Sequence, residues 1–199
     1  MCRAARLLAP CLALSLALVA TPALAHTGQG VTGGFLGGIE HPLFGPDHLV
    51  AMVAVGMWGA FLGAPAIWLL PVVFPLVMAF GGVLGILGVP MPGVEIGIAI
   101  SAIVLGAMVA LAARPPLLFA AIIVGVFAIF HGHAHGAELP ENASAIAYSL
   151  GFVLATGALH VTGIAIGLLV AWPSGRVVVR LAGAAVALAG LIFLGKLFT

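Results

Sequence analysis

Apolar runs of about 20 residues, separated by short stretches rich in Pro, Gly or charge, follow one another along most of this 199-residue chain. Only 6% of its residues are charged, whereas a soluble domain carries about 25%. So few charged side chains cannot cover a surface that faces water, and we therefore expect lipid to surround the chain. The net charge of +1 provides no basic surface for nucleic acid, which we do not expect as a partner.

The first 25 residues have the three parts of a secretory signal peptide. Two arginines form a basic n-region, an apolar stretch follows, and Ala-Leu-Ala at 23–25 is an A-x-A cleavage site. The alternative is an additional span, but the apolar stretch is shorter than the roughly 20 residues that a span needs. We predict a cleaved signal peptide at 1–25 and a single integral membrane transport domain at 26–199.

Both cysteines, Cys2 and Cys11, lie within the predicted signal peptide, so the mature chain has no thiol. Any metal would then be held by nitrogen, oxygen or methionine sulfur. The mature chain would begin at His26, whose α-amino group and imidazole can together chelate a divalent metal. A histidine is also simply tolerated after a cleavage site.

The remaining apolar runs predict an all-α membrane protein, a bundle of about six transmembrane helices that follows the signal peptide. Each run is near the length that crosses a bilayer, and the connections contain the Pro and Gly expected in turns between antiparallel helices. The predicted helices cover about 45–63, 66–88, 94–113, 116–136, 144–171 and 176–197.

The basic residues predict the orientation of these helices. With the mature N-terminus outside, Arg114, Arg176 and Arg180 fall in cytoplasmic loops, and only Lys196 falls outside. This distribution satisfies the positive-inside rule. We expect a multi-pass protein of a bacterial cytoplasmic membrane, with both mature termini on the periplasmic side.

The stretch HPLFGPDH, residues 41–48, interrupts the first apolar segment. A helix from 30 through 63 would be about 50 Å long at 1.5 Å per residue, which is too long for one straight span. We therefore expect a broken first helix, with a short outer half at 30–40 and the span at 46–63. Broken helices of this kind form cation sites in transporters.

Polar side chains at this break are candidate metal ligands. His41 and His48 can converge across it, with Asp47 beside them, and ionisable residues within a membrane are usually functional. Capping of the second helix would explain Asp47 but neither histidine. Two neighbours, Glu40 and Met52, complete this group of candidates.

A second polar group lies in FHGHAHGAE, residues 130–138. His131 and His135 are four residues apart and share one helix face, and Glu138 falls on the same face. Two imidazoles and a carboxylate suit nickel, cobalt, copper or zinc. His133 points elsewhere, as an outer ligand that captures the ion. The alternative is a solvated polar loop, which three alternating histidines disfavour.

His160 is the one histidine expected deep in the membrane. It lies about 24 Å along the fifth predicted helix, past the bilayer midplane. It is either a further metal ligand or a core residue bonded to Thr156 or Thr162. Because the first and fourth helices run in opposite directions, both polar groups above should lie at the outer face, with His160 further in. This layout predicts an inward cation path.

Two of these segments resemble a known family. HPLFGPDHLVAMVAVGMWGA at 41–60 and FHGHAHGAE at 130–138, behind a signal peptide, are similar to the HupE/UreJ family of hydrogenase and urease accessory proteins. The resemblance covers essentially the whole mature chain in layout. It implies a nickel permease, with cobalt as the substrate of some members. It also implies metal-binding roles for His41, Asp47, His48, His131, His135 and Glu138.

The leading hypothesis is therefore a permease for Ni²⁺ or Co²⁺ and not an enzyme. The metal is its transported substrate, and we expect no permanently bound cofactor. The expected partners are membrane lipid and a cytoplasmic metallochaperone that accepts the ion, while a homo-oligomer remains open.

Two other classes compete with transport. Paired histidines in a helical bundle can be axial ligands of haem in an electron-transfer subunit, which a Soret band would reveal. An intramembrane metal-dependent hydrolase is the weaker alternative, because the chain has no H-E-x-x-H motif.

Overall fold

The computed structural model describes residues 34–139 and 144–199, and within these ranges it consists of helices and connecting turns, without a strand. This confirms the predicted all-α class, and the helices lie close to the predicted boundaries. The predicted signal peptide and His26 lie outside the described residues. The helices are α2 (Phe35–Phe44), α3 (Pro46–Leu62), α4 (Ala66–Ile86), α5 (Val94–Ala110), α6 (Leu117–Ala137), α7 (Ala145–Gly167), the 3-10 helix η1 (Leu168–Ala171) and α8 (Pro173–Lys196).

Four helical segments in the described ranges are long and apolar enough to cross a membrane: α4, α6, α7 continued by η1, and α8. The bent pair α2–α3 provides a fifth candidate. The α5 helix has 17 residues, at the lower limit of what spans a bilayer. The six predicted segments are therefore all helical, but helix length alone supports four or five spans.

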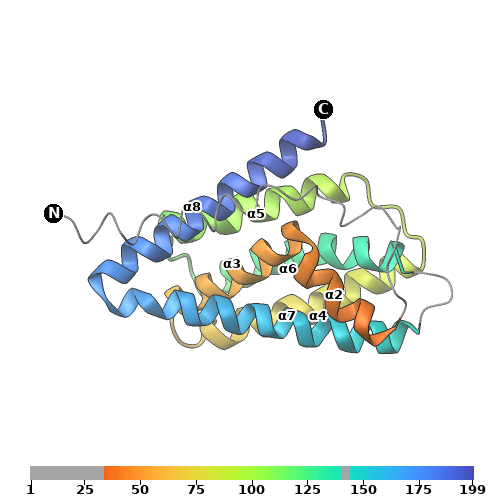
Figure 1. Ribbon diagram of the computed structural model, residues 1–199, viewed down its shortest axis with the longest axis horizontal. Helices are drawn as coiled ribbons and strands as arrows, with labels where there is room; N and C mark the ends of the chain where they lie inside the picture. Colours follow the sequence, from red (N-terminus) through yellow and green to blue (C-terminus); the bar gives the residue numbers. More distant parts are fainter. Residues whose placement is uncertain (1–33, 140–143) are drawn as a thin grey trace.

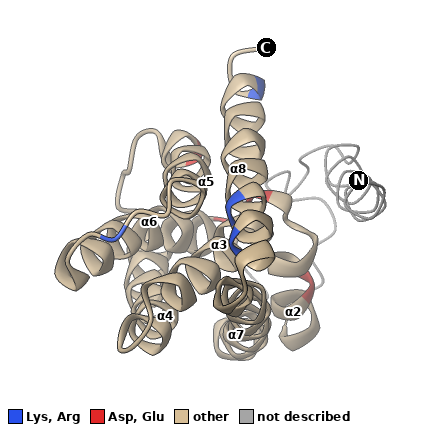
Figure 2. Ribbon diagram, turned by 90° about the vertical axis from the view of Figure 1, so that its left-hand side faces the viewer, with Lys and Arg blue, Asp and Glu red and all other residues tan. Residues whose placement is uncertain are grey.

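The outer surface of the bundle is apolar. Large hydrophobic side chains such as Trp68, Leu76, Phe119 and Leu154 are exposed on α4, α6 and α7. Figure 2 shows only scattered charged residues on the ribbon. An apolar exterior of this kind is stable in lipid and not in water, so the chain is a multi-pass helical membrane protein.

Helix α3 occupies the middle of the bundle and contacts α4, α5, α7 and α8. Around it, α4 packs against α6, α5 packs against α8, and α2 lies along α7 (Figure 1). Residues from α3 dominate the fully buried core, with Trp58 and Met57 among the largest side chains.

The break in the first helix lies later in the chain than the sequence predicted. Helix α2 continues past residue 40 to Phe44 and contains Pro42, and α3 starts at Pro46 after a bend of 80°. The residue before a proline is pushed away from helical geometry, and Gly45 is indeed extended, with φ −79° and ψ 103°. The prediction of an outer half that ends at 40 was therefore wrong, because Pro46 breaks the helix and Pro42 does not.

The arginines lie at one end of the bundle. Arg180, near the start of α8, donates a hydrogen bond from Nε to the carbonyl oxygen of Ala110 at the end of α5, at 2.7 Å. The guanidinium of Arg114 lies 4.8 Å from the centroid of the Phe61 ring, in the last turn of α3. This end is opposite the first turn of α3, where His48 lies.

Close packing of α6 on α4 fixes where the histidine-rich turns of α6 lie along α4 and the direction in which their side chains point. Gly132 and Gly136 alternate with those histidines, and each lies against α4 backbone. A Cβ atom at Gly132 would collide with the carbonyl oxygen of Met78, and one at Gly136 with that of Gly82. The glycines therefore allow the backbone contact that holds α6 in place.

Candidate metal site

The bend between α2 and α3 brings two histidines together. His41 lies in the last turn of α2, and His48 lies in the first turn of α3. Their ring centroids are 5.8 Å apart, with the rings nearly perpendicular. The predicted convergence across the break is therefore present in the structure.

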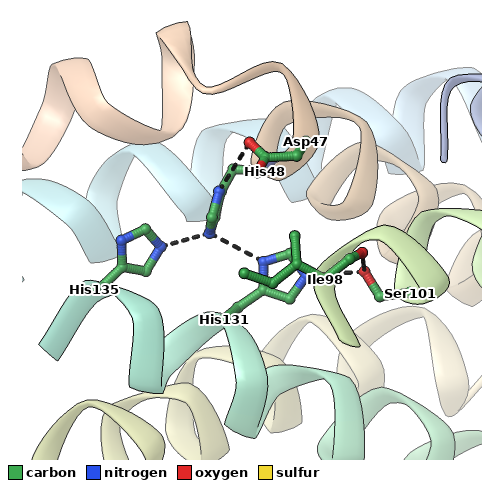
Figure 3. Close-up of polar contacts among 6 residues, drawn as sticks. All are labelled: Asp47, His48, Ile98, Ser101, His131 and His135. Carbon is green, nitrogen blue, oxygen red and sulfur yellow. Dashed lines mark hydrogen bonds and ion pairs between the residues drawn. The ribbon is translucent and has the colours of Figure 1, made fainter. Parts of the chain in front are cut away.

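Helix α6 contributes two more imidazoles from the face predicted by their spacing. The Nε2 atom of His135 lies 2.5 Å from His48 Nε2, and the Nδ1 atom of His131 lies 3.0 Å from the same atom (Figure 3). We call His41, His48, His131 and His135 the histidine cluster. Within it, His41, His48 and His135 each offer a ring nitrogen within 4.8 Å of the others.

Asp47 determines which nitrogen of His48 carries the proton. Its Oδ1 atom accepts a hydrogen bond from the backbone N–H of His48 at 2.9 Å and lies 3.3 Å from His48 Nδ1. Because an ionised carboxylate only accepts, Nδ1 must be the protonated nitrogen. Nε2 then carries a lone pair, which is directed toward His131 and His135. A carboxylate behind a histidine is the usual arrangement for a metal ligand.

Ser101 of α5 fixes the proton on His131 in the same way. Its hydroxyl donates to the carbonyl oxygen of Ile98 at 2.6 Å, so its oxygen is available to accept from His131 Nε2, which lies 2.9 Å away. Protonation at Nε2 leaves the lone pair of His131 on Nδ1, the atom that faces His48. In these tautomers the 3.0 Å contact joins two acceptor nitrogens, which can share a proton or bind a cation.

Such an arrangement attracts a cation. Lone pairs at this separation repel one another unless a proton or a metal ion lies between them. A proton would satisfy one pair of nitrogens, whereas the cluster directs at least three imidazoles to one small volume. Several neutral imidazoles around one point are a ligand set for divalent transition metals.

Aromatic side chains enclose the cluster. The ring of Phe152 lies 4.3 Å from that of His135, centroid to centroid, and Phe74 lies 5.5 Å from His131. A partly open cavity of about 240 Å³ between α4, α6 and α7 reaches His135 and is also lined by Tyr148 and Phe152. These apolar surroundings strengthen electrostatic interactions at the cluster.

Four other candidates from the sequence are not among the three histidines whose ring nitrogens converge. His133 is buried on another face of α6, where its Nε2 lies 2.7 Å from the carbonyl oxygen of Val89. Met52 is fully buried in the hydrophobic core of α3. Glu138 is the half-buried C-cap of α6, and Glu40 is exposed on α2. Their predicted roles as ligands stay predictions.

His160 is buried in α7, eight residues after Phe152 and thus further along the helix from the cluster. The centroid of its ring lies 5.7 Å from that of Phe74. Neither ring nitrogen of His160 has a hydrogen-bond partner within the described chain, and the Thr156 hydroxyl has none either. The alternative of a core histidine bonded to Thr156 or Thr162 is therefore not what the structure has.

Sequence reasoning missed Ser101 and the enclosing aromatic residues. A serine in the apolar run GIAISAIVLG is a polar group that must find a partner in the membrane, which is the signal that could have identified Ser101. Phe74 and Phe152 are aromatic residues among many, and only their three-dimensional positions distinguish them.

Comparison with known proteins identifies the family of this chain. The family described as HupE / UreJ protein matches residues 14–193. A relative, Protein HupE of Rhizobium leguminosarum bv. viciae, is 49% identical over 181 residues, which cover 90% of this chain and 95% of the relative. No solved structure matches the chain significantly. The chain therefore belongs to the HupE/UreJ family.

Proposed function

We propose that this protein is a permease that imports Ni²⁺, with Co²⁺ as an alternative substrate, across the cytoplasmic membrane for the maturation of a metalloenzyme. The observation that carries the proposal is the convergence of ring nitrogens from His41, His48 and His135 within 4.8 Å. It is supported by membership of the HupE/UreJ family, which the resemblance of the two histidine motifs also indicates.

The donor set favours borderline transition metals. Neutral imidazoles bind nickel, cobalt, copper and zinc, whereas magnesium and calcium prefer an all-oxygen site. Asp47, which accepts from His48, is an orienting residue that raises the basicity of a ligand. We propose transport and not catalysis, because a set of imidazole nitrogens at the outer end of a membrane-spanning bundle can capture an ion and release it again.

The distribution of charge supports inward transport. The arginines near Ala110 and Phe61 lie at the end of α3 opposite His48, and basic residues favour the cytoplasmic side. The histidine cluster would then face the periplasm, with both termini of the mature chain on that side. The ion would be captured outside and released inside to a cytoplasmic metallochaperone.

The decisive experiment is uptake of ⁶³Ni²⁺ by cells that express this chain, compared between wild type, His48→Ala and His133→Ala. The two variants remove the same side chain from different places: His48 is in the cluster, whereas His133 lies against Val89. We expect His48→Ala to abolish uptake and His133→Ala to retain most of it. Cobalt, zinc and copper as competitors rank the substrates.

Two results would contradict the proposal. If wild-type cells accumulate none of these metals, the protein is not their permease. If His48→Ala transports as well as wild type while its expression is equal, the histidine cluster is not the transport site.

A further inference from the structure

A second group of buried polar atoms lies deeper in the bundle than the histidine cluster. Both ring nitrogens of His160 and the hydroxyl of Thr156 lack hydrogen-bond partners among the described residues. His160 is 2% exposed and Thr156 is 0% exposed. Buried polar groups without partners are destabilising, particularly where no water can reach them, so their retention calls for a ligand.

Thr156 and His160 lie on one face of α7, which extends from the histidine cluster toward the interior of the bundle. Phe152, Thr156 and His160 are spaced four residues apart and therefore lie in one row along the helix. The first member, Phe152, contacts His135, and the last lies about 12 Å further along at 1.5 Å per residue. The row thus connects the cluster with the interior of the bundle.

The packing of α3 on α7 indicates the same separation between His160 and the histidine cluster. Gly56 of α3 lies directly against the backbone carbonyl of His160, where an added Cβ would collide with it. Gly56 is eight residues after His48, again about 12 Å along a helix. Phe74 contacts both a histidine of the cluster and His160: its ring centroid lies 5.5 Å from that of His131 and 5.7 Å from that of His160. The imidazoles of His131 and His160 therefore both contact the ring of Phe74.

Helix α4 offers an oxygen at this level. It contains Pro71 and Pro75, four residues apart. Because Pro75 has no N–H, the carbonyl oxygen of Pro71 loses the donor that a helix would normally provide. This carbonyl lies near the imidazole of His160 and forms no hydrogen bond with it. Carbonyl oxygens released from helices in this way coordinate cations in transporters.

We propose that His160 and Thr156, with the carbonyl oxygen of Pro71, form a second, inner binding site for the divalent cation, which receives the ion from the histidine cluster. One imidazole and two oxygens make a weaker ligand set than the cluster, which suits a site that must release the ion toward the cytoplasm. This inference rests on the proposed transport function and adds the intermediate position on its path.

The test is a titration of purified full-length protein in detergent with NiCl₂, measured by calorimetry. Wild type should bind one equivalent tightly and a second one more weakly. His160→Leu, which keeps the side-chain volume but has no nitrogen, should lose the second equivalent and keep the first. His48→Ala should lose the tight equivalent, so the two sites are separated in a single measurement.

Thr156→Val tests the site with a substitution that hardly changes shape, which guards against misfolding of His160→Leu. It should weaken the second equivalent severalfold. The matched control is Thr162→Val on the same helix, because the hydroxyl of Thr162 is exposed and donates to the carbonyl oxygen of Ala158 at 2.9 Å. This control should bind both equivalents as wild type does.

Uptake of ⁶³Ni²⁺ provides the second readout. We expect His160→Leu to lower the rate about tenfold while tight binding persists, a separation of binding from transport that no cluster variant would give. The inner site is overturned if His160→Leu and Thr156→Val leave the metal stoichiometry and the second affinity unchanged. If wild type binds no nickel at all, the proposed function itself fails.

Discussion

The Nε2 atom of His48 lies 3.0 Å from the Nδ1 atom of His131, although 83 positions separate the two residues in the chain. Asp47 directs the lone pair of His48 toward this contact, and Ser101 directs that of His131. Two hydrogen bonds outside the contact therefore leave this pair of nitrogens to share a proton or to bind a cation.

Removal of the Asp47 carboxylate should weaken metal binding without removing a ligand. In Asp47→Ala, His48 loses the acceptor that keeps its proton on Nδ1, and its ring no longer holds Nε2 toward the cluster. Loss of such an orienting partner typically lowers metal affinity about 10- to 100-fold. Calorimetric titration of the purified variant with NiCl₂ measures the change. An affinity equal to wild type would exclude the orienting role.

Ser101→Ala should have a smaller effect in the same direction. The substitution removes the oxygen that accepts from His131 Nε2, so either imidazole nitrogen can then carry the proton. The loss of one hydrogen bond corresponds to roughly a two- to tenfold lower nickel affinity. Thr162→Ala, which removes an exposed hydroxyl, is the control and should bind as wild type does. Equal affinities of the two variants would contradict the prediction.

Uptake should decline as the external pH becomes acidic, because protons compete with the metal for the imidazole nitrogens. Only a neutral imidazole has a lone pair for the metal, and protonation of the cluster removes that lone pair and adds a repelling charge. Binding is therefore favoured at neutral pH and weakened at acidic pH. Initial rates of ⁶³Ni²⁺ uptake between pH 5 and 8 provide the measurement. Undiminished uptake at pH 5 would count against capture by neutral histidines.

Gly132→Ala should destabilise the protein although it adds only a methyl group. The new Cβ would collide with the carbonyl oxygen of Met78, so α6 must move away from α4. Overpacking of this kind costs about 1–3 kcal/mol, which should appear as a lower melting temperature in detergent. Gly157→Ala is the matched control, since nothing lies within 4 Å of a Cβ atom there. Equal melting temperatures for the two variants would show that this contact can relax.

Periodicity and composition alone determined the class and the helices of this protein. Apolar runs of bilayer length require helices, because the backbone must satisfy its hydrogen bonds within each segment in lipid. The spacing of His131 and His135 likewise predicted one shared face, and both rings do meet His48. Local geometry decides these features, and local geometry is encoded in neighbouring residues.

The position of the break and the surroundings of the cluster depended on tertiary structure. Two prolines near residue 45 are equally plausible helix breakers in the sequence, but α2, which packs along α7, continues through Pro42, and the bend lies at Gly45. Ser101 lies 30 positions from His131, and His133 differs from His135 only in the side of α6 that it occupies. The contact between α6 and α4 decides which histidine of α6 reaches the cluster. In this contact, Gly132 and Gly136 fix the position of α6 along α4 and the rotation of α6 about its own axis. The sequence by itself therefore determined which residues can bind a metal, and the packing of the helices decided which of them converge.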